Sequence, residues 1–169
     1  MSLSKQLENL ANAAMLVTGI LLSVILVKQF LLPKPQAART VQGTNVSLAG
    51  VDWSKNGKTL VMALSTKCHF CTESAPFFQR VAKAAGGKVK LLAIFPQPRV
   101  EAEDYLAAVG VHVDDVKQAA LNSIGVAGTP TLLLVNKAGS VTDVWPGKLS
   151  PDKEAEVLRV VENAQSTGK

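Results

Sequence analysis

The sequence predicts an α/β domain with a central mixed sheet flanked by helices, preceded by one long apolar segment. Two observations support this fold class: apolar runs of strand length alternate with helical stretches, and a strand pair and an amphipathic helix close the chain. The 169 residues suffice for one domain and an appendage. We expect an N-terminal tail and transmembrane anchor over residues 1–32, a linker over 33–44 and one folded domain over 45–169.

The expected elements of the domain follow from apolar runs and the turn residues between them. Strands are expected at residues 46–53, 59–64, 89–95, 131–135 and 141–144. Helices are expected at residues 71–85, 101–109, 114–124 and 151–164. Pro76 should interrupt the first of these helices, because proline has no backbone N–H to donate to the preceding turn.

The apolar segment near the N-terminus has the length of a membrane span. Residues 9–27 contain no charged side chain, and residues 30–32 extend the apolar stretch. A helix needs about 20 apolar residues to cross a bilayer, whereas a signal peptide has a shorter apolar region and a clear cleavage site. Residues 36–38 match such a site poorly. We therefore expect a single-pass anchor in the lipid bilayer at about residues 10–32, rather than a signal peptide or a buried soluble helix.

The charges around the segment bear on its orientation. Lys5 precedes it, while Lys28, Lys34 and Arg39 follow it. Counted literally, the positive-inside rule places the folded domain in the cytoplasm, but Lys28 lies close enough to the helix end to snorkel. Charge alone therefore leaves the side of the membrane open.

Composition excludes several classes of function. The net charge of +5 comes from scattered lysines and arginines without interleaved aromatic residues, which argues against nucleic-acid binding. The only cysteines are Cys68 and Cys71, too few for a disulfide scaffold. The only histidines are His69 and His112, so a second ligand pair for structural zinc is missing. Two cysteines in a single C-x-x-C indicate redox chemistry.

The cysteine pair lies between an expected strand and an expected helix. A thiolate is the nucleophile in disulfide exchange, and a free cysteine with a pKa near 8.5 is mostly protonated at neutral pH. Cys68 at the start of a helix faces unpaired N–H groups and the positive end of the helix dipole, which favour the anion. We therefore assign Cys68 as the attacking thiol and Cys71, one turn later, as the resolving thiol.

A second motif lies about sixty residues further on. Residues 125–135 place a glycine, small residues and Pro130 directly before an apolar strand, and Pro76 follows Cys71 by five residues. With the C-x-x-C, these features make the chain resemble the thioredoxin-like proteins over residues 45–164. Among them it is most similar to the membrane-anchored TlpA/ResA-type thiol-disulfide oxidoreductases.

The resemblance implies a thioredoxin fold and a protein dithiol–disulfide oxidoreductase. Its redox group would be a Cys68–Cys71 disulfide, with no organic cofactor and no metal. Its partners would be protein thiols and disulfides and a further protein that recycles the pair. The resemblance also implies a cis peptide bond at Pro130, with the Thr129 backbone available to a substrate beside Cys68. Anchored members face outward, so we expect an extracytoplasmic, periplasmic domain.

Several positions depart from the family pattern. Lys67 replaces a tryptophan before the first cysteine, where its ammonium either favours the Cys68 thiolate or is a solvated surface charge. Met62 stands where thioredoxin has a buried aspartate. Ser74 stands where the TlpA/ResA group often has a glutamate, and Glu73 is one residue early. Glu73 is a candidate proton acceptor or a solvent-facing side chain, so the acceptor for Cys71 is unassigned.

The dipeptide between the cysteines is His69-Phe70. A charged histidine beside the nucleophile stabilises the thiolate. We therefore expect a reduction potential above that of thioredoxin, which is about −270 mV. In the alternative interpretation, His69 is an exposed residue that contacts partners.

Two other functions remain as alternatives. In a copper-binding or copper-delivery module of the same fold, Cys68, Cys71 and His112 would bind a soft ion. A peroxidase is disfavoured, because Ser65 fits the peroxiredoxin pattern whereas Val61 replaces its proline.

Overall fold

The computed structural model describes residues 12–23 and 42–163. The chain divides into two compact units, Met1–Gln36 and Ala37–Lys169. In the first unit, residues 12–23 form an α-helix with exposed side chains. The hydroxyls of Thr18 and Ser23 donate to carbonyl oxygens four residues earlier, each at 2.8 Å.

The predicted anchor lies partly outside the described residues. Of residues 10–32, only 12–23 are described, and most of the predicted linker also falls outside. Within the described residues, no helix has both the length and the apolar character needed to cross a membrane.

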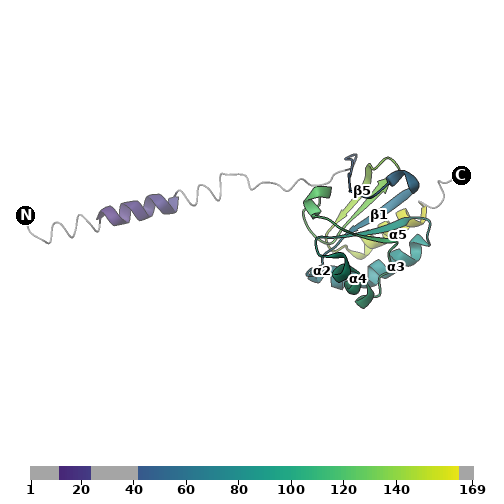
Figure 1. Cartoon of the computed structure of the whole chain (residues 1–169). Helices are drawn as coiled ribbons and strands as arrows, with labels where there is room; N and C mark the ends of the chain where they lie inside the picture. The colour runs from purple at the N-terminus through teal and green to yellow at the C-terminus, as the bar shows by residue number, and fades with distance from the viewer. Residues whose placement is uncertain (1–11, 24–41, 164–169) are drawn as a thin grey trace, which may run out of the picture. The chain divides into compact units, whose positions relative to one another are not determined.

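The second unit is built on a five-stranded mixed sheet with the order β3-β2-β1-β4-β5. Figure 1 labels β1 and the edge strand β5 of this sheet. The strands β1, β2 and β3 are parallel, whereas β4 is antiparallel to β1 and β5 is antiparallel to β4. The strands are β1 (Lys58–Ala63), β2 (Lys90–Phe95), β3 (Asp115–Gln118), β4 (Thr131–Asn136) and β5 (Val141–Pro146).

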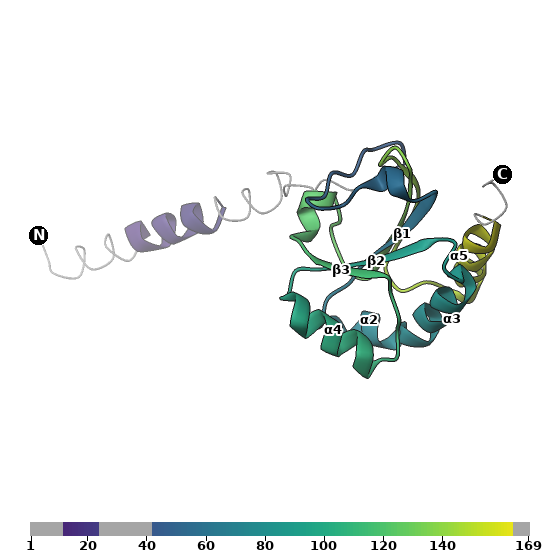
Figure 2. The same cartoon turned by 45° about the vertical axis from the view of Figure 1, so that its right-hand side comes forward.

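The two faces of the sheet have different covers. One face packs against α3, α4 and α5, and Figure 2 shows these helices on the same side of the sheet. The other face is covered by residues 46–53 and by two short 3-10 helices. The helical elements are η1 (Trp53–Lys55), α2 (His69–Glu73), α3 (Ala75–Ala85), α4 (Arg99–Ala108), η2 (Leu121–Ile124) and α5 (Pro151–Asn163).

Sheet register positions the two sequence motifs. Ala63, the last residue of β1, is paired with Thr131, the first residue of β4. Because the two strands are antiparallel, the segment that follows β1 and the segment that precedes β4 leave the same end of the sheet. These segments contain Cys68 and Pro130, respectively.

The helix after the cysteines is interrupted, as the sequence predicts. The helix α2 ends at Glu73, Ser74 caps both helices, and α3 begins at Ala75 with Pro76 in its first turn. Proline is tolerated there because the first N–H groups of a helix have no partner within it.

The predicted helix at residues 114–124 is wrong. Residues 115–118 form the edge strand β3, and only the 3-10 helix η2 follows. Val116 packs into the core on the helical face while Asp115 and Lys117 alternate with it, which is the two-residue period of a strand. The free edge of β2 provides hydrogen-bonding partners that outweigh the helical composition of this segment.

The predicted strand at residues 46–53 is also wrong. Asn45 makes one isolated bridge to Ser140, and the following residues cross the sheet as a covering segment. Gly50 adopts a positive φ of 73°, and Asp52 caps η1 by accepting a hydrogen bond from the Ser54 N–H. Val46 and its apolar neighbours therefore pack on the sheet face instead of extending it.

Candidate functional site: the Cys68–Cys71 pair and the Pro130 loop

Cys68 lies directly before α2 as its N-cap residue. Its sulfur accepts a hydrogen bond from the Cys71 backbone N–H, with an N···Sγ distance of 3.2 Å. The Cys68 thiol in turn donates to the Thr129 carbonyl oxygen at 3.3 Å. Both cysteines are free thiols, so the structure represents the reduced pair. The Cys68 sulfur thus touches both sequence motifs.

Cys71 lies one turn into the helix and is fully buried. Burial raises the pKa of the Cys71 thiol to about 12, and the hydrogen bond and charge of Cys68 act in the same direction. The Ser65 backbone and the Thr129 side chain partly oppose this change in pKa. Met62, where thioredoxin has a buried aspartate, belongs to the same buried cluster as Cys71. Its apolar side chain can accept no proton.

The loop before β4 forms the other wall of the site. The Thr129–Pro130 peptide bond is cis, as the resemblance implies. The Gly147 N–H, from the loop after β5, donates to the Pro130 carbonyl at 2.7 Å. A surface pocket of about 410 Å³ lies beside this loop, and Gly128, Thr129 and Gly147 are among its lining residues.

The segment between β1 and Cys68 is held by the connection from β2 to α4. The Gln97 side chain donates to the Ser65 hydroxyl at 2.9 Å and accepts from the Thr66 N–H at 3.4 Å. The Thr66 hydroxyl also bonds to Glu101. These contacts hold the segment before Cys68 from the β2 side of β1. The Pro130 loop leads into β4, which lies on the other side of β1.

Glu73 lies at the centre of a small ion-pair network. Its two carboxylate oxygens contact His69 Nε2 at 3.0 Å and Lys148 Nζ at 2.8 Å. The hydrogen bond from Lys148 lowers the pKa of Glu73, with His69 contributing in the same direction. A carboxylate with a lowered pKa accepts a proton less readily, so this geometry does not favour Glu73 as the acceptor for Cys71.

The remaining predicted residues lie on the surface around Cys68. Phe70 is 54% exposed, and its ring centroid lies 5.9 Å from that of His69. Lys67 is exposed. Both side chains are therefore available to a molecule that approaches the Cys68 thiol.

The three residues that would bind copper in the alternative function, Cys68, Cys71 and His112, do not form a cluster in the structure. In the described ranges 12–23 and 42–163, no group of three or more His, Cys, Asp and Glu side chains is arranged to hold a metal ion. His112 is exposed in the connection from α4 to β3, beside Gly110 and Asp114.

Sequence reasoning missed the residues that support the site from other segments. Lys148 binds Glu73, Gln97 holds Ser65, and the Tyr105 hydroxyl lies 3.2 Å from the Thr72 hydroxyl. Burial raises the pKa of Tyr105. None of these side chains belongs to a motif, and only the packing of α4 and the loop after β5 brings them close.

Comparison with known proteins identifies the fold. No protein-family description and no curated protein matches the sequence. Among solved structures, a proposed thiol:disulfide interchange protein DsbE from Chlorobium tepidum matches with a TM-score of 0.59 at 19% identity, over 74% of this chain and 98% of that one. The domain therefore has the thioredoxin fold.

Two further structures lead to the same fold. StoA from Bacillus subtilis matches with a TM-score of 0.51 at 18% identity, over 69% of this chain and 94% of its own. A secreted Mycobacterium tuberculosis disulfide oxidoreductase homologous to E. coli DsbE matches with a TM-score of 0.52 at 19% identity, over 75% and 99%. The expected fold is thus confirmed for the domain.

The two thiols should differ sharply in reactivity. At pH 8 a thiol with a pKa of about 12 is ionised to about one part in ten thousand. We expect iodoacetamide to modify Cys68 and spare Cys71 in the folded reduced chain, as measured by peptide mass spectrometry. The Cys71 rate should rise about tenfold per pH unit up to about pH 12, because only the thiolate reacts. In urea both cysteines should react, and equal rates in the folded chain would contradict the assignment.

The ion pairs around Glu73 should tune the reduction potential of the cysteine pair. A positive charge near Cys68 would stabilise the reduced form as its thiolate; His69 carries such a charge only when protonated, and the Glu73 carboxylate, 3.0 Å from its Nε2, would then partly neutralise it. Relative to the unsubstituted chain, His69→Ala should lower the potential and Glu73→Gln should raise it, each by about 10–30 mV. Equilibration with glutathione measures both shifts, with Glu162→Gln on the exposed side of α5 as control. Shifts of the same sign would exclude this electrostatic effect.

Proposed function

We propose that this chain is a membrane-anchored protein dithiol–disulfide oxidoreductase that exchanges disulfides with protein partners through Cys68 and Cys71. The observation that supports this most directly is the position of the Cys68 sulfur, between the Cys71 N–H and the Thr129 carbonyl at the start of a helix. The structural relatives named above include a secreted disulfide oxidoreductase and a proposed thiol:disulfide interchange protein.

In the first step, the Cys68 thiolate attacks one sulfur of a partner disulfide. The S–S bond of the partner breaks, a mixed disulfide forms at Cys68, and one partner thiolate leaves. The Cys71 thiolate then attacks the Cys68 sulfur and releases the second partner thiolate. Two electrons pass to the partner, and Cys68 and Cys71 end as a disulfide. The reverse sequence oxidises a partner dithiol.

The timing of the second step follows from the causes of the raised Cys71 pKa. Two of these causes are the hydrogen bond and the negative charge of Cys68. Both change when Cys68 enters a mixed disulfide, because its sulfur then has no ionisable proton. The pKa of Cys71 should therefore fall at the stage where its thiolate is needed. Desolvation, the largest cause of the raised pKa, stays in place, so this decrease assists the attack of Cys71 on the mixed disulfide without removing the whole barrier to its ionisation.

A partner segment would bind across the Pro130 loop. The Thr129 carbonyl that receives the Cys68 thiol would become available to a backbone N–H of the partner. The pocket of about 410 Å³ beside this loop and the exposed Phe70 ring, two residues after Cys68, offer apolar contacts. Such contacts suit an extended protein segment that contains a cysteine.

Anchoring and location form the second part of the proposal. The described helix at residues 12–23 carries exposed Met15, Leu16, Ile20 and neighbouring apolar side chains, and its two hydroxyls bond within the helix. A helix that satisfies its own polar groups suits a bilayer. The apolar sequence at about residues 10–32 would then anchor the chain with its domain on the extracytoplasmic side.

Activity should depend on both cysteines in different ways. With insulin as substrate, Cys68→Ser should lower the reduction rate by about two orders of magnitude, because the attacking sulfur is lost. Cys71→Ser should instead accumulate mixed disulfides, visible on non-reducing gels and removed by dithiothreitol. The double variant is the control and should form none. Full activity of Cys68→Ser, or stoichiometric copper binding without dithiol activity, would contradict the proposal.

Membrane attachment should require the N-terminal segment. The full chain should remain in the membrane pellet after an alkaline carbonate wash, whereas a chain starting at Val41 should be released. Ile20→Arg should reduce the membrane-bound fraction, since an arginine at the centre of a span costs about 2.5–3.5 kcal/mol. Met15→Leu is the matched apolar control. Equal extraction of the full and shortened chains would exclude an anchor, and protease digestion of sealed vesicles reports the side of the domain.

A further inference from the structure

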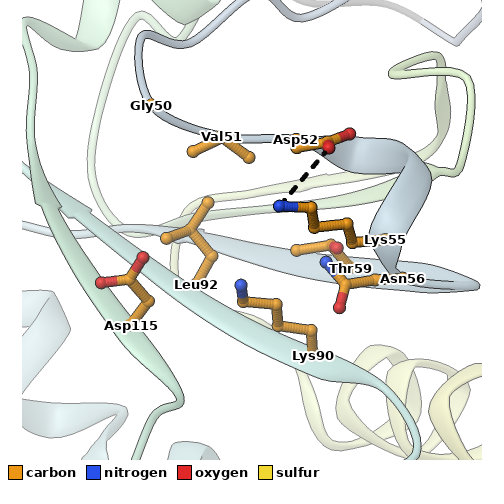
Figure 3. A pocket seen from close by; sticks show the side chains of 9 residues that line it. All are labelled: Gly50, Val51, Asp52, Lys55, Asn56, Thr59, Lys90, Leu92 and Asp115. Carbon is orange, nitrogen blue, oxygen red and sulfur yellow. Dashed lines mark ion pairs between the residues drawn. The ribbon is translucent and has the colours of Figure 1, made fainter.

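A second polar cavity lies at the opposite end of the strands from the cysteines. Its volume is about 170 Å³, it is partly open to solvent, and it lies between residues 50–56 and the starts of β1, β2 and β3 (Figure 3). Because β1 runs from Thr59 in this cavity toward Cys68, the two sites lie at different ends of the same strand. The cavity is smaller than the pockets that bind drug-sized molecules, at about 300–1,000 Å³.

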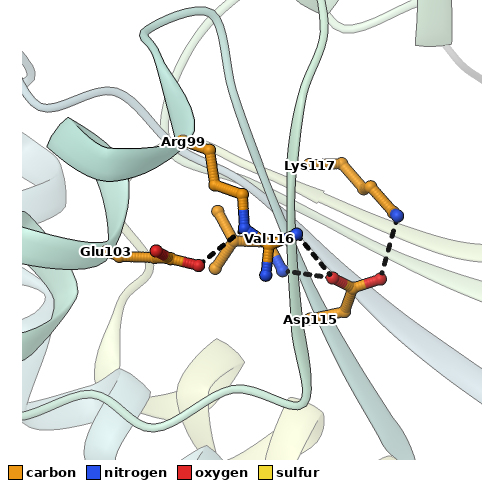
Figure 4. Close-up of polar contacts among 5 residues, drawn as sticks. All are labelled: Arg99, Glu103, Asp115, Val116 and Lys117. Carbon is orange, nitrogen blue, oxygen red and sulfur yellow. Dashed lines mark hydrogen bonds and ion pairs between the residues drawn. The ribbon is translucent and has the colours of Figure 1, made fainter.

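The two carboxylates that line the cavity are already matched by other groups. Asp115 accepts from the Val116 N–H at 2.9 Å and pairs with Arg99 at 3.7 Å and Lys117 at 3.3 Å (Figure 4). Asp52 accepts from the Ser54 hydroxyl at 2.6 Å and the Ser54 N–H at 3.1 Å. It also pairs with Lys55, as Figure 3 shows. Neither carboxylate therefore needs a cation from outside.

The lining side chains of Thr59 and Lys90 have no hydrogen-bond or ion-pair partner among the described residues, and both are hydrogen-bond donors. Thr59 and Lys90 are register partners on adjacent strands and line the cavity together. Within residues 12–23 and 42–163, neither the Thr59 hydroxyl nor the Lys90 amine has a side-chain partner in the structure. Thr59 is only 2% exposed. Since no fully enclosed side-chain polar atom of the described residues lacks a partner, the Thr59 hydroxyl retains some accessible surface, and Thr59 lines the cavity.

The shape of the cavity brings these donors together. In Figure 3 the Lys90 amine points toward the interior, and the Asn56 amide lies beside Thr59. Leu92, which follows Lys90 on the same face of β2, and Val51 supply apolar surface to the cavity. One unpaired positive charge, one buried hydroxyl and one amide form a donor set for an oxygen-rich anion.

We propose that this cavity binds one small oxyanion, a phosphate or a short carboxylate, through Lys90, Thr59 and Asn56. The anion neutralises Lys90 and accepts the Thr59 hydroxyl proton in a hydrogen bond, while the carboxylates of Asp52 and Asp115 keep their present partners. Because Asn56 follows η1 and the other two donors belong to the sheet, the bound anion joins the end of η1 to the sheet. Binding is independent of the redox chemistry at Cys68.

The test is a titration of the full chain, followed by amide NMR. Inorganic phosphate and, separately, acetate are added while sodium chloride keeps the ionic strength constant. We expect saturable shifts at the amides of Gly50, Asn56 and Lys90 with at least one of the two anions. Preference for phosphate identifies a tetrahedral ligand, and preference for acetate identifies a carboxylate.

Two variants and a control distinguish a specific anion-binding site from non-specific electrostatic attraction of anions to surface lysines. Lys90→Ala should weaken binding about tenfold, as expected for the loss of a charged hydrogen bond. The isosteric Thr59→Val should weaken it several-fold. Lys88→Ala, an exposed lysine outside the cavity, is the matched control and should bind like the unsubstituted chain. The proposal is overturned if neither anion gives saturable shifts, or if Lys88→Ala and Lys90→Ala lose affinity equally.

Discussion

The structure depends on the placement of one sulfur atom between a hydrogen-bond donor and an acceptor. Cys68 Sγ accepts from the Cys71 N–H and donates to the Thr129 carbonyl. The donor belongs to the first turn of a helix and the acceptor to a loop sixty residues away. Only the antiparallel register of β1 with β4 places both at the same end of the sheet. The pairing of β1 with β4 thus sets the position of the Cys68 sulfur between its two hydrogen-bonding partners.

Burial divides the chemistry between two otherwise identical side chains. Cys68 is partly exposed at the helix start, whereas Cys71 is enclosed by the apolar cluster that contains Met62. Desolvation disfavours a charged sulfur at position 71, and the hydrogen bond and charge of the free Cys68 thiol add to this effect. A site of this kind needs no dedicated carboxylate to order its two steps. The substitution of an acidic residue by Met62 is compatible with that order.

Sequence alone predicts the parts of the fold that are set by local patterns. The buried strands at the centre of the sheet and the break at Pro76 follow from apolar runs and from the position of the proline, whereas the cis bond at Pro130 is implied by the family resemblance. The edge strand β3 does not, because its helical composition is outweighed by the open edge of β2. Contacts such as Glu73 with Lys148 join residues 75 positions apart, and no local pattern encodes them.

Hydrogen bonds connect the start of the folded domain, by way of β5, to the loop beside the cysteines. Residues 43–46 are hydrogen-bonded to the turn and first residue of β5, and the Trp53 ring lies against Gly139, where a Cβ atom would come within 2.9 Å. The strand β5 ends beside Gly147, whose N–H bonds to Pro130. The start of the domain and the Pro130 loop are therefore both hydrogen-bonded to β5 or to the residues directly beside it.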